Sequence, residues 1–215
     1  MTTLTRELAN SPYAHHVFTE TQLARIIGGS DQRRYGLVNR ALKSGELVRV
    51  KRGLYVLSDA LRSDSIHPFH LAQALHPGSY ISLESALAYH GWIPEAVYTT
   101  TSVVLGGRSR QITHETLGQF TFTPLALERL HFLELVDRLK VQQQTMLVAK
   151  PIRALMDLVY ARKVQWQGIA WLEEYLRIDG ESLLSVTSDD VAVLKNVYKH
   201  SRMQAFLGHF EDAVV

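Results

Sequence analysis

The sequence has 215 residues, enough for one large domain or two small ones, and its 46% hydrophobic and 20% charged residues are typical of a globular chain. The absence of cysteine excludes disulfides, thiolate metal sites and cysteine nucleophiles. Apolar runs such as Met146–Ala149 are far shorter than the ~18 residues of a membrane span. The first residues lack the pattern of a signal peptide, so we expect a cytoplasmic protein that does not enter a membrane.

The charge is distributed unevenly along the chain. Residues 1–62 hold ten Lys and Arg against five Asp and Glu, whereas residues 63–215 hold 13 against 16. Seven of the ten N-terminal cations lie between Arg33 and Arg52. A basic block of this kind in a small domain indicates a polyanionic partner such as nucleic acid, although a solvated surface would also explain it.

Three short helices are expected in the first 44 residues. Thr19 and Gln22 have the spacing of a capping box, in which two side chains satisfy each other's free backbone N–H groups at a helix start. Apolar residues recur at helical spacing on either side of this box. The helices are expected over residues 2–10, from 20 to 27 and from 30 or 31 to 44, separated by Ser11-Pro12 and Gly28-Gly29.

The third helix is amphipathic, with one apolar and one basic face. At helical spacing its apolar face contains Tyr35, Val38, Ala41 and Leu42. Its outward face contains Gln32, Arg33, Gly36, Arg40 and Lys43, with Asn39 at the edge. A basic, polar face with a glycine that permits close approach suits a helix that enters the DNA major groove. We expect Gln32, Arg33 and Arg40 to contact base edges.

A basic β-hairpin is expected directly after this helix. Val48 and Val50 alternate with Arg49 and Lys51, which predicts a strand with one apolar and one basic face. The segment Lys51-Arg52-Gly53 predicts a turn, and residues 54–57 the returning strand. Helices followed by a basic hairpin predict a winged helix-turn-helix, whose tip touches a phosphate or the minor groove. The cations expected on the DNA backbone are Lys43, Arg49, Lys51 and Arg52.

A polar segment, Ser58–Ser65, predicts a linker with the domain boundary near residue 62. The expected fold class is therefore α+β: a winged helix-turn-helix domain over residues 1–62, then a mixed α/β domain over residues 63–215 with a small sheet and C-terminal helices. Strands are expected over 96–105, 120–123, 132–136 and 146–149, with helices near residues 68–76 and 83–90 and from Pro151 onward.

Three stretches, in this order, resemble the AbiEi family of bacterial antitoxins. The first is Val50-Lys51-Arg52-Gly53-Leu54-Tyr55-Val56, similar to the hairpin of that family. The second is Tyr80-Ile81-Ser82-Leu83-Glu84-Ser85-Ala86-Leu87-Ala88-Tyr89-His90-Gly91, similar to the segment that opens its second domain. The third is Ala149-Lys150-Pro151-Ile152-Arg153-Ala154-Leu155-Met156-Asp157, similar to a helix start of the family except that Arg153 stands where Lys is expected.

The resemblance implies the function of a type IV toxin–antitoxin system, a class associated with phage resistance. The winged helix would bind inverted repeats in double-stranded DNA of its own promoter and repress its operon. The C-terminal domain would counteract a cognate nucleotidyltransferase-like toxin, a functional partnership that does not require a tight complex. Two alternatives remain open: an antitoxin that neutralises its toxin by direct binding without DNA recognition, and a stand-alone transcriptional regulator.

No catalytic, metal or cofactor site is expected, and the chain is not expected to be an enzyme. Metal-dependent nucleases of the restriction type use clustered carboxylates with a nearby lysine, and the sequence contains no Asp-x-Lys or Glu-x-Lys. Asp157 is interpreted as a surface group of a helix that forms a cap or a salt bridge. His67 and His70 have the spacing of a zinc pair, but neither a carboxylate nor a cysteine follows nearby.

Overall fold

The computed structural model describes residues 1–178 and 180–214, and the fold is mixed α+β. The chain divides into two compact units. The first contains Met1–Leu75 together with Lys140–Thr145, and the second contains His76–Leu139 and the residues from Met146 onward. None of the described helices is both long and apolar enough to cross a membrane.

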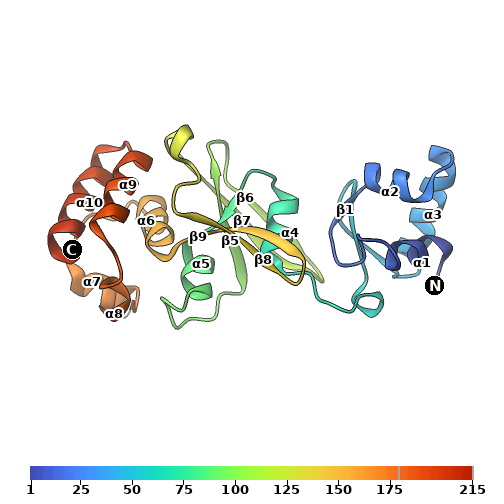
Figure 1. Cartoon of the computed structure of the whole chain (residues 1–215), viewed down its shortest axis with the longest axis horizontal. Coiled ribbons are helices and arrows are strands. Elements are labelled where there is room, and N and C mark those ends of the chain that lie inside the picture. The colour runs from blue at the N-terminus through green and yellow to red at the C-terminus, as the bar shows by residue number, and fades with distance from the viewer. Residues whose placement is uncertain (179, 215) are drawn as a thin grey trace. The chain divides into compact units, whose positions relative to one another are not determined.

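The first unit consists of helices and a small sheet (Figure 1). Its elements are α1 (Thr3–Ala9), β1 (Phe18–Thr19), α2 (Glu20–Ile27), α3 (Asp31–Lys43), β2 (Leu47–Lys51), β3 (Leu54–Leu57), a 3-10 turn (Asp59–Leu61) and α4 (Pro68–Leu75). The three expected helices are present, and the capping box of Thr19 and Gln22 is confirmed at the start of α2. Ser30 caps α3 by accepting a hydrogen bond from the Arg33 N–H group.

One apolar core holds these elements together. Buried side chains from every element between α1 and β3 meet in it, and one of its aromatics, Phe18, has no exposed surface. The other members include Leu4, Leu8, Leu23, Val38, Ala41, Leu47, Tyr55 and Leu57. Because α3 contributes Val38 and Ala41 to this core, the residues on the opposite side of the helix are directed to solvent.

The expected position of Tyr35 on the buried face of α3 is wrong. Tyr35 is 72% exposed, whereas Val38 and Ala41 are buried as expected. The periodicity of a helix gives the angles between its side chains but not the width of the sector that its neighbours cover. Here α1, α2 and the sheet cover the sector around Val38 and Ala41, and Tyr35 lies at its edge.

The sheet of the first unit has three strands in the order β1-β3-β2, all antiparallel. The two-residue strand β1 is not evident in the sequence, and it pairs Phe18 with Tyr55 and Thr19 with Leu54. The hairpin turn between β2 and β3 is only Arg52-Gly53, with Gly53 at a φ of 76° that favours glycine. The Gly53 carbonyl accepts a hydrogen bond of 3.2 Å from the Glu20 N–H group, so the turn is fixed to the start of α2.

Glu46, in the connection between α3 and β2, anchors the start of α1. Its carboxylate accepts hydrogen bonds from the Thr2 N–H group at 2.8 Å and from the Thr5 hydroxyl at 2.7 Å. These bonds, that from Thr5 first, lower the pKa of Glu46 to about 2. The carboxylate therefore holds the first helix against the end of the third.

We expect acidification to loosen α1 through Glu46. A carboxylate with a depressed pKa contributes stability above its unfolded pKa of 4.5, and this contribution is lost as the pH falls toward about 2. The amide NMR signals of residues 3–9 should therefore lose dispersion in this window in the native protein. In Glu46→Gln they should already be perturbed at pH 7 and change little between pH 4.5 and 2. Identical pH profiles for the two proteins would contradict this role.

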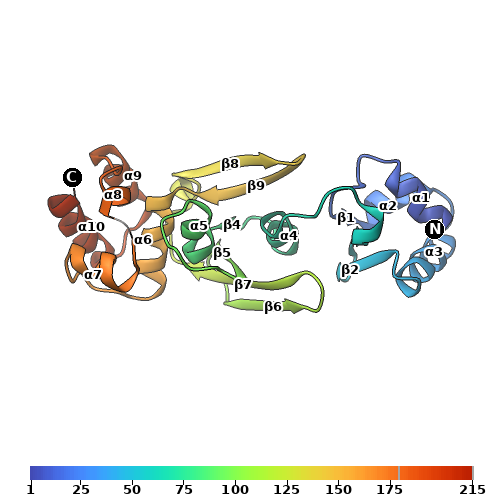
Figure 2. The same cartoon turned by 90° about the horizontal axis from the view of Figure 1, so that it is seen from below.

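The second unit contains a six-stranded mixed sheet in the order β6-β7-β5-β4-β9-β8. The strands are β4 (Tyr80–Ile81), β5 (Thr99–Leu105), β6 (Arg110–His114), β7 (Gly118–Leu125), β8 (Val136–Val141) and β9 (Gln144–Ala149). Figure 2 shows the hairpins β6–β7 and β8–β9 at opposite edges of this sheet. The helices are α5 (Leu83–Tyr89), α6 (Pro151–Ala161), α7 (Ile169–Tyr175), α8 (Gly180–Leu183), α9 (Ser188–Val197) and α10 (Ser201–Val214).

Two sequence expectations for this sheet are corrected. Residues 132–136 were expected to form a strand, but residues 132–135 form a turn in which Leu135 has a φ of 54°, and β8 begins only at Val136. The edge strands β6 and β8 were not expected, because charged and polar residues at exposed positions interrupt their apolar pattern. Charged edge strands are common, since they discourage pairing with other chains.

Helix α6 is buried along most of its length, with every side chain from Ile152 to Val159 buried. It lies between the sheet and the C-terminal helices (Figure 1). The expected surface position of Asp157 is therefore wrong: its carboxylate has no exposed area and forms an ion pair with Arg153 at 3.2 Å. Ser82, the N-cap residue of α5, forms no capping hydrogen bond with its side chain and donates its hydroxyl to Asp157 at 2.7 Å.

A buried polar network surrounds this ion pair. Asp157 also accepts hydrogen bonds from the hydroxyls of Tyr80 at 2.8 Å and Tyr198 at 2.6 Å. Arg153 donates to Tyr80 at 2.6 Å and to the carbonyls of Glu134 and Phe132. Burial lowers the pKa of Arg153, but Asp157, Tyr198 and Tyr80 together outweigh it and the pKa rises. Residues of the second and third family-like stretches thus meet in the core, where they stabilise the fold.

Candidate nucleic-acid interface

The outward side of α3 is a cationic surface. The side chains of Gln32, Arg33, Arg40 and Lys43 are exposed, and Gly36 lies half-buried among them. A Cβ atom added at Gly36 would meet no atom within 4 Å, so packing within the protein does not require a glycine there. A helix-interior glycine costs about 1 kcal/mol relative to alanine. An external surface that must approach the helix closely would explain why it is tolerated.

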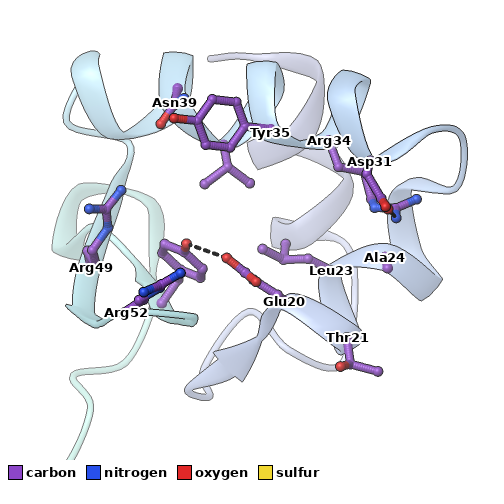
Figure 3. A pocket seen from close by; sticks show the side chains of 12 residues that line it. Glu20, Thr21, Leu23, Ala24, Asp31, Arg34, Tyr35, Asn39, Arg49 and Arg52 are labelled. Carbon is purple, nitrogen blue, oxygen red and sulfur yellow. Dashed lines mark hydrogen bonds and ion pairs between the residues drawn. The ribbon is translucent and has the colours of Figure 1, made fainter.

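A hollow of about 810 Å³ adjoins this helix (Figure 3). It lies between α2, α3 and the hairpin β2–β3. The residues that line it are Glu20, Thr21, Leu23, Ala24, Asp31, Arg34, Tyr35, Val38, Asn39, Arg49, Arg52 and Tyr55. Arg49 and Arg52, two of the residues predicted to contact the DNA backbone, lie on the hairpin side of this hollow. They are across from Tyr35 and Asn39 of α3.

The charges in the hollow are partly balanced. Glu20 accepts a hydrogen bond of 3.1 Å from the Tyr55 hydroxyl. Burial first, and then Glu20, raise the pKa of Tyr55, so the phenol stays protonated at neutral pH. Arg34 is paired with Asp31 and also donates to the Gly29 carbonyl, so its guanidinium is held by groups at the start of α3. The arginines that line the exposed hairpin side are Arg49 and Arg52.

The structure places the predicted hairpin cations in different surroundings. Lys51 is still in β2, and its ammonium donates a 2.7 Å hydrogen bond to the Leu75 carbonyl. Arg52 occupies the turn and is exposed. The turn was expected to include Lys51 and to form a projecting tip, but only two residues connect the strands, and Gly53 is bound to the start of α2. The hairpin is therefore short and stays close to α2.

Sequence reasoning missed three polar residues that border the hollow: Glu20, Tyr35 and Asn39. Tyr35 was assigned to the core, and Asn39 was placed only at the edge of the outward face. The signal that could have found them is the one-turn spacing of Tyr35 and Asn39, which brackets Gly36. Glu20 gave no such signal, since its proximity to the hairpin arises from the pairing of β1 with β3.

His67 and His70, at the start of α4, show no metal-binding arrangement. The His67 Nδ1 accepts a hydrogen bond from the Phe69 N–H group, and the His70 Nδ1 lies 3.1 Å from the Thr145 carbonyl. Burial and the neighbouring His70 lower the pKa of His67. Within residues 1–178 and 180–214, no group of three or more His, Cys, Asp and Glu side chains is placed to hold a metal ion.

Comparison with known proteins gives a family match for part of the sequence and a similar fold among solved structures. Residues 14–58 match the family described as transcriptional regulator, AbiEi antitoxin, which confirms the resemblance over the segment that carries α2, α3 and the hairpin. No curated protein matches the sequence significantly. The fold is similar to that in the crystal structure of the RV2827C protein from Mycobacterium tuberculosis, with a TM-score of 0.60 and 13% identity over 98% of this chain and 75% of that one.

Proposed function

From the match of residues 14–58 to AbiEi antitoxin regulators and from the cationic face of α3, we propose that this protein is a sequence-specific DNA-binding antitoxin that represses its own operon. In this proposal residues 1–62 form a winged helix-turn-helix, and residues 63–215 form the antitoxin domain. The observation that carries it is the outward face of α3, which presents exposed cations and the exposed amide of Gln32 around a glycine that the protein's own packing does not require.

The proposed binding mode follows from the positions of these side chains. Helix α3 enters the major groove, where Gln32, Arg33 and Arg40 reach base edges and Lys43 contacts the backbone. Arg49 and Arg52 contact a phosphate beside the helix, because both line the hollow across from α3. Lys51 contributes to DNA affinity only if its hydrogen bond to the Leu75 carbonyl breaks.

The second half of the proposal concerns the toxin. The C-terminal domain counteracts a nucleotidyltransferase-like toxin in the cytoplasm, with no catalytic group, metal or cofactor of its own. Its support is the family match of the N-terminal segment alone. Co-expression with the product of the adjacent open reading frame tests it: we expect that product to arrest growth, and this protein to restore growth.

Autorepression can be measured with a reporter gene placed behind the chain's own upstream region. We expect the native protein to reduce reporter output, and the Arg33→Ala/Arg40→Ala double variant to restore it. Growth rescue by the double variant should remain intact, because these residues lie on the DNA-binding unit. Unchanged reporter output with the native protein would favour an antitoxin that acts without DNA recognition.

Replacing Gly36 by alanine should have opposite effects on stability and DNA binding. Alanine raises helix propensity and meets no atom within 4 Å, so the free energy of unfolding should rise by about 0.5–1 kcal/mol. The added methyl group should keep α3 from approaching the bases and weaken binding to the upstream region. Chemical denaturation and fluorescence anisotropy measure the two effects.

Gly208 provides the matched control. It lies inside α10, and a Cβ added there would also meet no atom within 4 Å. Gly208→Ala should stabilise the protein to a similar degree without altering its affinity for DNA. If Gly36→Ala binds the upstream region as tightly as the native protein, close approach of DNA at this position is refuted.

A further inference from the structure

We propose that Asn39 and Tyr35 form a base-reading pair that recognises an A·T-containing step: Asn39 binds an adenine, and Tyr35 packs against the methyl group of an adjacent thymine. This inference rests on the proposed DNA binding and names the determinants of its sequence preference. Neither residue belongs to the set that the basic pattern of the sequence singled out.

Tyr35 and Asn39 are placed on α3 so that both can contact the same segment of DNA. They are four residues apart, so they are neighbours on one side of the helix, about 6 Å along its axis. Figure 3 shows both at the helix side of the hollow, across from Arg49 and Arg52. If Arg49 and Arg52 contact the DNA backbone, a DNA strand occupies the space between them and α3. The side chains of α3 that border this space then face the edges of the bases.

Tyr35 is exposed and Asn39 is half-buried, and within the described residues the polar groups of both side chains are free. Tyr35 is 72% exposed, which is unusual for a large aromatic unless it meets a partner. Throughout residues 1–178 and 180–214, neither the Asn39 amide nor the Tyr35 hydroxyl has a hydrogen-bond partner. Both are therefore available to a ligand. By contrast, Arg34 on the same helix is held by Asp31.

The chemistry of the side chains selects the bases. An asparagine amide offers one acceptor and two donors, and it pairs bidentately with N6 and N7 of adenine in the major groove. The ring of Tyr35 is an apolar surface that can contact the C5-methyl group of thymine. Gly36 lies beside both residues and carries no side chain, so the groove floor can approach the helix at this point.

The test selects duplexes from a random-sequence library with the native protein and with Asn39→Ala, Tyr35→Ala and Tyr35→Phe. We expect the native motif to contain an A·T pair whose preference disappears in Asn39→Ala, and an adjacent T whose preference disappears in Tyr35→Ala but persists in Tyr35→Phe. In the native motif, 7-deazaadenine or uracil at these positions should each weaken binding about tenfold. The two alanine variants should be insensitive to the corresponding analogue.

Asn10→Ala and Tyr98→Ala serve as matched controls, since both residues are exposed and lie outside α3. They should select the native motif. If the native protein selects a motif and Asn39→Ala and Tyr35→Ala select the same one with equal strength, the base-reading pair is refuted while DNA binding stands. If the native protein selects no motif, the proposed sequence-specific function fails, and the pair with it.

Discussion

Asp157→Ala should lower the free energy of unfolding of the second unit by about 3–5 kcal/mol. The substitution leaves the guanidinium of Arg153 buried without its counter-ion and removes the acceptor of three hydroxyl hydrogen bonds, from Tyr80, Ser82 and Tyr198. All three tryptophans, Trp92, Trp166 and Trp171, lie in the second unit, so tryptophan fluorescence during urea denaturation reports on it alone.

Two further variants identify the cause. Asp212→Ala, at an exposed position of α10, removes an aspartate without opening the core and should change the stability little. The double variant Arg153→Met/Asp157→Leu should recover much of the loss, because replacing a buried pair by apolar groups removes the cost of the unpaired charge. A loss below about 1 kcal/mol in Asp157→Ala would contradict the role assigned to this network.

The second large effect is expected on α3. Replacing Arg33 or Arg40 by alanine should cost ~1–3 kcal/mol each in binding to the native upstream region and little on unrelated DNA, if both read bases. The two residues lie two helical turns apart, a separation of about 10 Å, which corresponds to about three base pairs. The double variant should therefore show nearly additive losses.

Arg6→Ala is the control for this prediction, because Arg6 is an exposed arginine on α1 of the same unit. It should leave the affinity for the native region nearly unchanged. Equal losses for Arg33→Ala on native and unrelated DNA would identify that arginine as a phosphate contact instead. No loss on either sequence would show that this side of α3 does not face DNA.

Local patterns in the sequence were sufficient for α1, α2, α3 and the β2–β3 hairpin of the first unit, but not for the short strand β1. The capping box at Thr19 and the alternation around Arg49 depend only on neighbouring residues, and helix and strand formed where these patterns predicted. The face of α3 was less predictable, since the exposure of Tyr35 depends on how far α1, α2 and the sheet extend around the helix. The same holds for Lys51, whose partner carbonyl at Leu75 lies 24 residues away.

The second unit was harder to predict for the same physical reason. Its central ion pair joins two residues of one helix, but the groups that bury it come from β4, the turn near Phe132 and Tyr198 after α9. A charged residue such as Asp157 is therefore indistinguishable from a surface residue until these distant segments meet. The edge strands β6 and β8 were missed because exposed polar residues weaken their apolar alternation.

Sequence-specific DNA binding through α3 is tested most directly by fluorescence anisotropy across a salt series. The purified protein is titrated into its own upstream region and into a scrambled duplex of the same composition. We predict tighter binding to the native region. We also predict that the logarithm of the association constant falls by about 0.9 per unit of log salt concentration for each phosphate contacted. Equal affinity for both duplexes would contradict autorepression, and no binding to either at low salt would contradict the DNA-binding function altogether.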